Sequence, residues 1–393
     1  MKILHAADWH LGRRLKHWEL LDEQRLFLDQ LLATLEREGV GLLLIAGDFF
    51  DRSQPGPEAL DLARDFFSRL AQLDCQTVLI AGNHDSPELL SFASVYARDQ
   101  GLHIRSKLDD FRQPLSFGSG DERVHCYALP YLRRGDIEEE LGQSFASFDE
   151  AFSAILAELD LSLEGPKVLL AHQFVAGAEL SESERSTSVG TAQALSRELF
   201  RDFSYCALGH LHRPQSLGPE DWRLRYAGSP LAYSLSEAGQ EKSWTLFRSE
   251  GGQLRDFYLL PIQARRQVQR LQGTAEEVLD LGRRLQAGAR QMGPRGAVYN
   301  LDDYYFIDLE LGEGPRLEAR QLAQIFPRFL GLRQLGLGPQ SEQYHAAPAE
   351  LETQSPWELC QQLYRQKSDS DLDDWSRHYV QQLLKSALEE VEV

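Results

Sequence analysis

The chain is an acidic protein of 393 residues, in which 60 Asp and Glu residues outnumber 41 Lys and Arg residues and give a net charge of −19. This balance excludes proteins that hold nucleic acid by bulk positive charge, because phosphate binding by counterion release needs an excess of Lys and Arg. At roughly 100 to 200 residues per domain, the length predicts two or three domains.

The first third of the chain alternates short apolar runs with amphipathic stretches, a pattern typical of parallel strands connected by helices. We expect strands at residues 2–7, 41–46 and 77–81, with helices at 20–37 and 57–73 between them. Each of these strands runs directly into polar residues. Open α/β sheets bind ligands beyond the carboxyl ends of their strands, so these polar clusters predict a single site.

A second group of strands follows and is typical of a mixed or antiparallel sheet. The expected strands lie at residues 124–129, 167–171, 205–208, 224–227, 244–248 and 257–262. Two of them run into histidines, at His172 and at the pair His210 and His212. Between these two strands, a stretch rich in Ser, Glu and Gly at residues 178–191 predicts a long surface loop.

The character of the chain changes near residue 263. The sequence predicts a smaller α+β domain from here on. Its expected elements are a strand at 268–271, a helix opened by the capping box of Thr274 and Glu277, a strand at 304–311 and a helix at 317–326. We therefore divide the chain into four parts. They are a large α/β domain at 1–262, a smaller α+β domain at 263–338, a linker at 339–355 and a helical tail at 356–393.

No signal for a membrane or for secretion is recognisable in the sequence. Its apolar runs fall well short of the roughly 20 residues needed to cross a bilayer. Asp8 follows the N-terminus too closely for the apolar core of a signal peptide. We expect a cytoplasmic protein without membrane contact.

The polar clusters at the strand ends contain two carboxylates, one amide and five imidazoles. These residues are Asp8, His10, Asp48, Asn83, His84, His172, His210 and His212. A single histidine at a strand end is more often structural, but several clusters at one expected edge favour a metal site. Carboxylates and imidazoles without thiolates suit Mn²⁺, Fe²⁺ or Zn²⁺. So many ligands predict two ions, about 3.5–4 Å apart, an arrangement that serves in-line displacement at phosphorus.

The motifs resemble those of a known enzyme family. Five motifs follow one another in a fixed order: DxH at residues 8–10, GDxxD at 47–51, GNHD at 82–85, a single histidine at 172 and GHxH at 209–212. This order resembles that of the calcineurin-like metallophosphoesterases. More narrowly, DWHLG at 8–12, AGNHDS at 81–86, LPY at 129–131 and YAGSP at 226–230 are similar to the SbcD family of bacterial nuclease subunits. The resemblance implies a four-layer α/β/β/α sandwich with a smaller α+β capping domain and a C-terminal helical tail.

The resemblance also implies a role for each ligand. One metal is held by Asp8, His10, Asp48 and His212, and the other by Asp48, Asn83, His172 and His210, so that Asp48 bridges the two. His84 then stays outside the metal shell, where it stabilises the attacked phosphate or protonates the departing 3′ oxygen. By analogy with phosphoprotein phosphatases, we hypothesise that the Asp51 carboxylate orients His84 and favours its protonated form. The alternative is a surface aspartate.

Basic residues follow several of the motifs and predict contacts to a phosphate backbone. The candidates are Arg13, Arg14, Arg52, Arg133 and Arg213. Seven arginines against three acids between residues 265 and 295 add a local positive charge to the capping domain. The alternative is a set of ordinary solvated arginines.

The tail predicts a protein partner. By the resemblance, its two helices dock on an SbcC-type coiled-coil ATPase, in a heterotetramer that contains a homodimer of this chain. Aromatic and apolar residues at helical spacing are the expected anchors, namely Trp357, Leu363, Tyr364, Trp375, Tyr379 and Leu383. The alternative is packing against the chain's own domains.

These features predict a Mn²⁺-dependent DNA phosphodiesterase. The resemblance implies an ATP-dependent 3′–5′ exonuclease on double-stranded DNA ends and an endonuclease on single strands and hairpins. The main alternative is a small-molecule or nucleotide phosphodiesterase with the same dimetal core. A non-enzymatic metal-bearing scaffold is disfavoured because no ligand of the motifs is missing.

Overall fold

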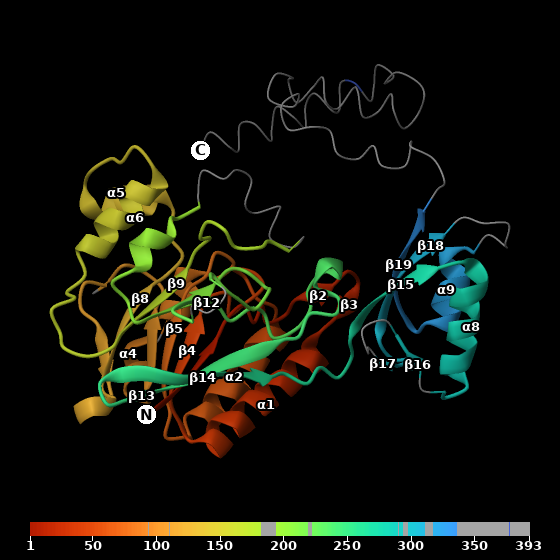
Figure 1. Ribbon diagram of the computed structural model, residues 1–393, viewed down its shortest axis with the longest axis horizontal. Coiled ribbons are helices and arrows are strands. Elements are labelled where there is room, and N and C mark those ends of the chain that lie inside the picture. Colours follow the sequence, from red (N-terminus) through yellow and green to blue (C-terminus); the bar gives the residue numbers. More distant parts are fainter. Residues whose placement is uncertain are drawn as a thin grey trace. The chain divides into compact units, whose positions relative to one another are not determined.

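The computed structural model describes residues 1–92, 94–109, 111–181, 194–218, 222–289, 291–293, 298–310, 317–335 and 377. The chain divides into two compact units, Met1–Gln334 and Leu335–Val393. The elements below belong to the first unit, apart from the last residue of the final strand (Figure 1). The predicted linker and tail lie outside the described residues, except for Arg377. In the described part of the chain, every helix is too short or too polar to serve as a membrane span.

The first of two six-stranded sheets is mostly parallel and has the order β14-β13-β1-β4-β5-β6. Its strands are β1 (Lys2–Ala6), β4 (Val40–Ala46), β5 (Gln76–Ile80), β6 (Leu102–Arg105), β13 (Ser243–Glu250) and β14 (Gln253–Pro261). Strands β1, β4, β5 and β6 run parallel, whereas β13 is antiparallel to β1 and forms a hairpin with β14. The three strands predicted in the first third of the chain are confirmed.

The second sheet has the order β11-β12-β10-β9-β8-β7. Its strands are β7 (Leu115–Phe117), β8 (Val124–Leu129), β9 (Lys167–His172), β10 (Tyr205–Gly209), β11 (Gln215–Ser216) and β12 (Leu224–Tyr226). Strands β8, β9, β10 and β12 run parallel, and the edge strands β7 and β11 are antiparallel to their neighbours. The predicted mixed sheet is therefore confirmed, although β13 and β14 belong to the first sheet.

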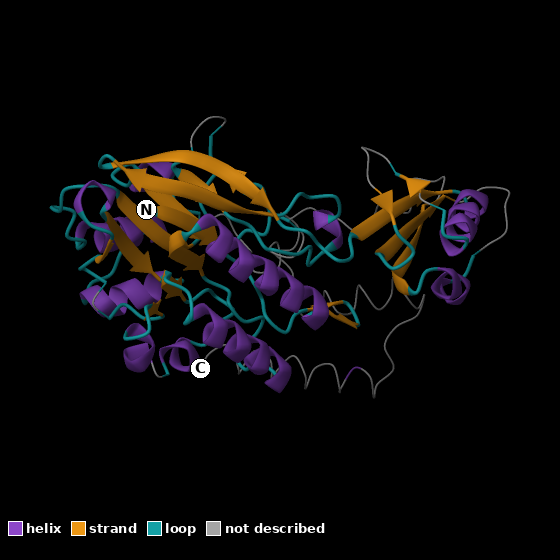
Figure 2. Cartoon of the chain, turned by 90° about the horizontal axis from the view of Figure 1, so that it is seen from below, coloured by secondary structure: helices purple, strands orange, loops and turns teal. Residues whose placement is uncertain are grey.

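Three apolar layers hold the two sheets and their helices together. Residues such as Leu42, Val78 and Leu170 fill the space between the sheets. Helices α1 (Leu21–Glu38) and α2 (Pro57–Leu70) cover the outer face of the first sheet, and α5 (Arg134–Leu141) and α6 (Phe148–Ala157) cover that of the second (Figure 1). Figure 2 shows the helices and strands from a second direction. This arrangement confirms the predicted α/β/β/α sandwich.

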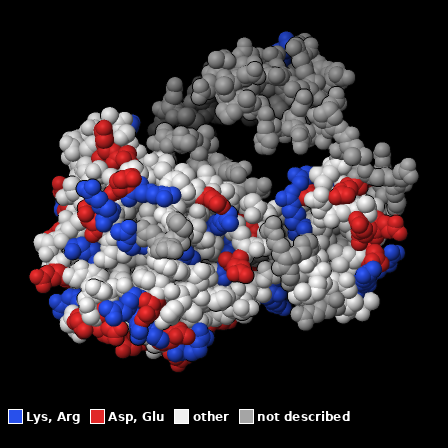
Figure 3. Space-filling model, viewed as in Figure 1, with Lys and Arg blue, Asp and Glu red and all other residues white. Residues whose placement is uncertain are grey.

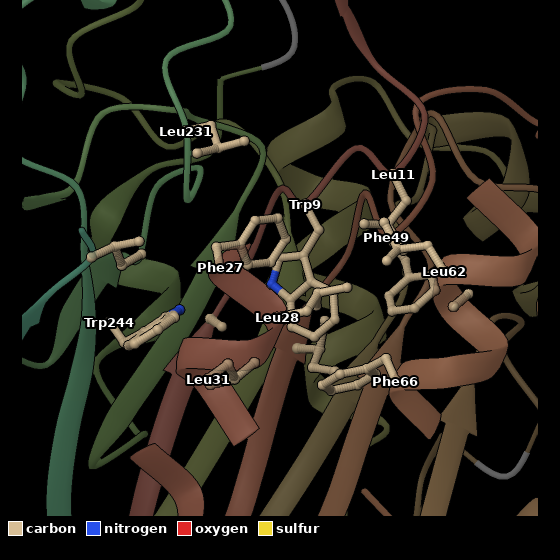
Figure 4. Packing of buried hydrophobic residues seen from close by; sticks show 14 of the residues in the cluster. Trp9, Leu11, Phe27, Leu28, Leu31, Phe49, Leu62, Phe66, Leu231 and Trp244 are labelled. Carbon is tan, nitrogen blue, oxygen red and sulfur yellow. The ribbon is translucent and has the colours of Figure 1, made fainter. Parts of the chain in front are cut away.

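Helix α1 and the loop after β1 pack around one buried tryptophan. Trp9 lies between the candidate ligands Asp8 and His10 and is fully buried (Figure 4). Its ring meets Phe27 of α1 and Phe66 of α2 edge to face, with centroids 5.8 and 5.1 Å away. Burial of a large aromatic side chain among other rings stabilises its position strongly. The core thus anchors the loop from which two candidate ligands project.

Short elements connect the main ones. They are β2 (Arg14–Leu15), β3 (Trp18–Glu19), α3 (Pro87–Ser91), α4 (Ser94–Arg98), the 3₁₀ turns η1 (Gly120–Glu122), η3 (Arg197–Phe200) and η4 (Leu235–Glu237), β16 (Gln291–Met292) and β17 (Val298–Tyr299). Helix α3 begins at Ser86, whose hydroxyl accepts a hydrogen bond from the N–H of Leu89. This cap fixes the turn that follows the GNHD motif.

The capping segment forms a three-stranded sheet, in the order β15-β18-β19, with two helices. Its elements are β15 (Val268–Gly273), α8 (Ala275–Gln286), β18 (Tyr304–Glu310), α9 (Ala319–Ile325) and β19 (Arg328–Leu335). The Thr274 and Glu277 capping box opens α8, as predicted. The segment has an apolar core of its own, which includes Leu271, Ile307 and Phe326.

Buried polar contacts tie the capping segment to α1. The Arg266 guanidinium donates to the Glu23 carboxylate, and the Tyr304 hydroxyl donates to the same carboxylate at 3.0 Å. Arg266 also donates to Asp302 at 2.8 Å. Both Glu23 and Arg266 are buried, so removing one partner would leave a costly unpaired charge. The predicted boundaries at residues 262 and 338 remain a proposal.

The two sheets approach within backbone contact at Gly209, the last residue of β10. A Cβ at this position would lie 1.9 Å from the carbonyl oxygen of Ala46 in β4 and 2.7 Å from Nδ1 of His172. We therefore expect Gly209→Ala to lower the free energy of unfolding by about 3 kcal/mol, measured by urea denaturation. Gly135→Ala in α5 is the control, because among the described residues its Cβ would meet nothing within 4 Å. Equal stability of both variants would contradict this account of the close approach.

Candidate metal centre

The candidate ligands gather where the carboxyl ends of both sheets meet. The loop after β1 is bonded to the loop after β4, since Asp8 N–H donates to Gly47 at 3.0 Å and His10 N–H donates to Asp48 at 2.9 Å. The loop after β10 joins them, because His210 N–H donates to Asp8 Oδ1 at 2.8 Å. Main-chain and side-chain bonds together hold the three loops in one arrangement.

Four candidate ligands adopt a left-handed backbone conformation. Their φ angles are 55° for Asp8, 45° for His10, 50° for Asp48 and 96° for His210. Residues other than glycine rarely adopt positive φ, although Asp and His do so more readily than most. Such strain persists only where the surrounding structure enforces it, and it is concentrated at functional sites.

The first ligand group consists of Asp8, His10 and His212, with one ligand atom from each within 4.8 Å of the others. The Nε2 atoms of His10 and His212 lie 3.0 Å apart. Oδ2 of Asp8 is buried and has no hydrogen-bond partner among the residues that the structure describes. An unpartnered carboxylate oxygen beside two imidazoles fits a divalent cation, which would satisfy all three groups.

The second group is centred on Asp48, whose Oδ2 lies 3.2 Å from Nε2 of His172. Oδ1 of Asn83 lies 3.1 Å from the same nitrogen and 3.0 Å from Nδ1 of His210. Asp48 Oδ2 also lies 3.5 Å from Nε2 of His10, in the first group. The structure thus places Asp48 between the two groups, where a bridging ligand would lie.

The protonation states of several of these residues favour metal binding. Burial, more than any other cause, lowers the pKa of His210 to about 3 and holds the pKa of His10 well below its usual range. Both rings are therefore neutral at pH 7, the form in which imidazole binds a metal. Nδ1 of His172 donates to the Ala46 carbonyl oxygen at 2.8 Å, which leaves Nε2 facing the ligands.

His84 lies beside the ligands. Its N–H donates to Asp48 Oδ1 at 2.9 Å, and its ring meets that of His10 edge to face at 4.8 Å. Its Nδ1 donates to the main-chain oxygen of Asp51 at 2.9 Å. Because a carbonyl oxygen only accepts hydrogen bonds, Nδ1 carries the proton and Nε2 is the nitrogen left for a substrate.

The Asp51 carboxylate does not pair with His84 in the way we hypothesised. It accepts a hydrogen bond from Arg13 Nη1 at 2.8 Å, and it lies 3.7 Å from Nδ1 of His10. The turn at this residue directs the carbonyl oxygen to His84 and the side chain to Arg13. Asp51 thus orients His84 through the main chain, which a side-chain substitution does not remove.

This geometry changes the expected effect of Asp51→Asn. We expect the pH dependence of phosphodiester cleavage to stay as in the wild type, with a fall in rate of less than about tenfold, because the bond to His84 is kept. Rates measured over a pH series would test this. A displaced pH profile would show that the carboxylate acts on His84 after all.

The arginines that we predicted to contact DNA have different surroundings. The Arg14 guanidinium donates to Glu19 and that of Arg213 donates to Glu179, whereas Arg52 is 78% exposed and Arg133 is exposed at the start of α5. Arg13 lies over the Tyr233 ring. Exposed ion pairs contribute little, so the exposed Arg14, Arg52, Arg133 and Arg213 remain free to exchange partners, whereas Arg13 is half-buried and paired with Asp51. Their contact with DNA stays a prediction.

Acidic neighbours offset part of the positive charge predicted for the capping segment. Arg266 is paired with Glu23 and Asp302, and Arg270 donates to Asp308 at 2.6 Å. Basic and acidic side chains are interspersed on the face seen in Figure 3. The acids that neutralise these arginines lie outside the sequence window in which the arginines were counted.

Sequence reasoning missed several residues that support the ligands. Asp85 accepts hydrogen bonds from the N–H groups of Phe49 at 3.1 Å, Phe50 at 2.8 Å and Gly82 at 2.9 Å. Burial, together with Asp48, raises its pKa to about 7 against these three bonds. Its place in the GNHD motif was the only signal of this role.

Gln24 and Glu237 were also missed. Gln24 Nε2 donates to the His10 carbonyl at 2.7 Å, and Glu237 Oε1 lies 3.3 Å from Nδ1 of His212. Neither residue stands in a recognisable motif. The six predicted partner contacts, Trp357, Leu363, Tyr364, Trp375, Tyr379 and Leu383, lie outside the described residues.

Comparisons with known proteins show what the chain is similar to. The chain is 28% identical over 393 residues to the SbcD component of the SbcCD nuclease of Staphylococcus epidermidis, a match that covers 99% of each chain. Two solved structures cover about two thirds of the chain at low similarity. GAP50, the anchor in the inner membrane complex of Plasmodium, has a TM-score of 0.40 at 12% sequence identity. The match covers 67% of this chain and 89% of GAP50. TT1561 of Thermus thermophilus has a TM-score of 0.35 at 11% sequence identity. The match covers 66% of this chain and 98% of TT1561.

The match to a family model spans all eight candidate residues of the metal centre. The model of the calcineurin-like phosphoesterases matches residues 1–214, more than half of the chain, and ends just after His212. Members of such a family hydrolyse phosphate esters with divalent metals, a chemistry that the buried carboxylates and imidazoles fit. The chain belongs to the calcineurin-like phosphoesterase family.

Proposed function

We propose that this chain is a two-metal DNA phosphodiesterase that acts as the nuclease subunit of a complex with an SbcC-type coiled-coil ATPase. One observation carries the choice of DNA. The family model ends at residue 214, but the similarity to a nuclease subunit extends over the whole chain. The capping segment and the tail are thus shared with a nuclease, and a small substrate needs neither.

The two ligand groups support two metal ions, for which we propose Mn²⁺. Asp8, His10, Asp48 and His212 would hold one ion, and Asp48, Asn83, His172 and His210 the other. When bound, such a pair supplies a hydroxide at neutral pH and stabilises charge on the attacked phosphate. His84 then serves the departing 3′ oxygen, which needs a proton as the bond to phosphorus breaks. In its doubly protonated form, the ring gives up the Nε2 proton and keeps the Nδ1 proton on the Asp51 main-chain oxygen.

The net charge of the chain bears on how it would bind DNA. With a net charge of −19, the protein gains little affinity for DNA from its surface as a whole. Arg13, Arg52 and Arg133 follow motifs of the metal centre and would position a phosphate backbone locally. We therefore propose that tight binding of DNA ends and hairpins requires the ATPase, through the helical tail at residues 356–393. A homodimer of this chain within a heterotetramer with the ATPase fits this role.

The proposal can be tested with the purified chain, Mn²⁺ and three substrates. Linear duplex DNA should be degraded from its 3′ ends when the ATPase and ATP are present, and a hairpin should be opened. The ester bis(p-nitrophenyl) phosphate should be hydrolysed by the chain alone. Hydrolysis of the ester without any DNA cleavage by the complex would favour a small-molecule phosphodiesterase. Failure on every substrate would favour a metal-bearing scaffold.

A further inference from the structure

The candidate ligand His212 is held by a buried cluster that no motif of the sequence predicted. Ser229, Glu237 and Lys242, which we call the His212 clamp, are 1%, 0% and 8% exposed. Glu237 ends the turn η4, and Lys242 directly precedes β13. The clamp therefore reaches His212 from parts of the chain that follow the last ligand motif.

The clamp contacts both the ring and the main chain of His212. Oε1 of Glu237 lies 3.3 Å from Nδ1 of the ring. The main-chain oxygen of His212 accepts hydrogen bonds from Lys242 Nζ at 2.8 Å and from the Ser229 N–H at 3.1 Å. Nε2 of the same ring faces His10 in the first ligand group. The contacts thus fix which nitrogen of His212 faces the metal position.

The members of the clamp also bind one another. Lys242 Nζ donates to Glu237 Oε2 at 2.7 Å and to Ser229 Oγ at 3.0 Å, and Ser229 Oγ donates to the same carboxylate at 3.2 Å. A buried ion pair of this kind is seldom more stable than apolar residues of the same shape, because both charges lose their water. Stability of the fold alone therefore does not account for the clamp.

His172, another candidate ligand, differs from His212 in the group that its Nδ1 atom faces. Nδ1 of His172 donates to the Ala46 carbonyl oxygen, which is neutral, whereas Nδ1 of His212 faces a carboxylate. A carboxylate behind a ligating imidazole fixes its tautomer and raises its basicity. The group nearest to Nδ1 is therefore a neutral carbonyl at His172 and a carboxylate at His212, and the Asp8 carboxylate lies farther from His172, at 4.0 Å.

We propose that Glu237 and Lys242 are positioning residues that set the metal affinity of the His212 position. Glu237 holds the Nδ1 proton of His212 so that Nε2 presents its lone pair to the metal. Lys242 holds both the carboxylate and the main chain in place. This role depends on the metal centre of the proposed function but not on DNA as its substrate, so failure of the nuclease assay would leave it testable.

The test is a Mn²⁺ titration of the full chain by calorimetry, with thermal unfolding in EDTA as the second measurement. We expect Glu237→Gln to weaken binding at one of the two Mn²⁺ positions by about 10 to 100-fold. The double variant Glu237→Gln with Lys242→Met removes both buried charges. It should show the same loss of affinity and unfold in EDTA close to the wild-type temperature.

Asp308→Asn is the matched control. Asp308 is a buried carboxylate that accepts hydrogen bonds from Arg270 and Arg333 within the capping sheet, away from the ligands. The Asp308→Asn substitution should leave the Mn²⁺ affinities of both positions unchanged. If the single Glu237 variant does not fold, the Mn²⁺ titration of the double variant tests the proposal. Wild-type affinity at both positions in that variant would overturn the proposal, and so would a wild-type chain that binds no Mn²⁺.

Discussion

Replacement of His84 by glutamine is expected to lower phosphodiester cleavage by about 10² to 10⁴-fold while both metal ions stay bound. The imidazole is the group that carries a proton to the leaving oxygen, and glutamine has no titratable proton to give. The hydrogen bond of this residue to Asp48 is made by its main chain, because the N–H donates to Asp48 Oδ1, so the substitution keeps that bond. Cleavage rates and a Mn²⁺ titration measure the two effects separately.

His17→Gln is the control for this variant, because His17 is exposed and lies outside the ligand groups. It should cleave at the wild-type rate. A His84→Gln enzyme that keeps its rate within about threefold would exclude His84 from proton transfer. Loss of metal in the same variant would instead make His84 a ligand, since its ring lies within 4.8 Å of ligand atoms from His10 and Asp48.

Replacement of Asp48 by asparagine is expected to have the largest effect of any single change. Asparagine keeps the shape, tolerates the left-handed conformation and can still accept the bond from His84 N–H. It removes the negative charge between the two ligand groups, so Mn²⁺ affinity should fall by at least about 100-fold. Because the metals supply the nucleophile and several kcal/mol of charge stabilisation, cleavage should fall by about 10³-fold or more.

Asp61→Asn, on the exposed face of α2, is the control for Asp48→Asn. Thermal unfolding with and without Mn²⁺ gives a second measurement, since a ligand that binds only the folded state raises the unfolding temperature. The wild type and the Asp61 variant should respond to Mn²⁺, and the Asp48 variant should not. A wild-type response of the Asp48 variant would remove this residue from the bridging position.

The fold was predictable where local pattern and burial agree. Residues 41–46 form a continuous apolar run, and β4 is buried along nearly its whole length in the middle of the first sheet. Asp, Asn and His at the ends of such strands signalled the site, because parallel strands bring their carboxyl ends to one edge. The eight candidate residues of the metal centre were all found in this way.

Side-chain direction and distant partners were not predictable. The analogy with phosphoprotein phosphatases placed Asp51 near His84 but did not show that its carbonyl, rather than its carboxylate, faces the ring. Glu237 and Lys242 lie beside His212 in a fold in which β13 pairs with β1, a contact between residues more than 200 positions apart. Strand β19 was missed as well, since Pro327 suggested only the end of a helix.

The left-handed conformation of Asp8, His10, Asp48 and His210 has a consequence for how this protein can change. Each such residue costs about 1 kcal/mol relative to glycine, which adopts positive φ freely. A chain selected for thermal stability alone would therefore gain by placing glycine at these four positions, and it would lose the candidate ligands by the same substitutions. In the metal centre that we propose, stability and metal binding compete at the same residues, so the sandwich around them must supply enough stability to keep their side chains in place.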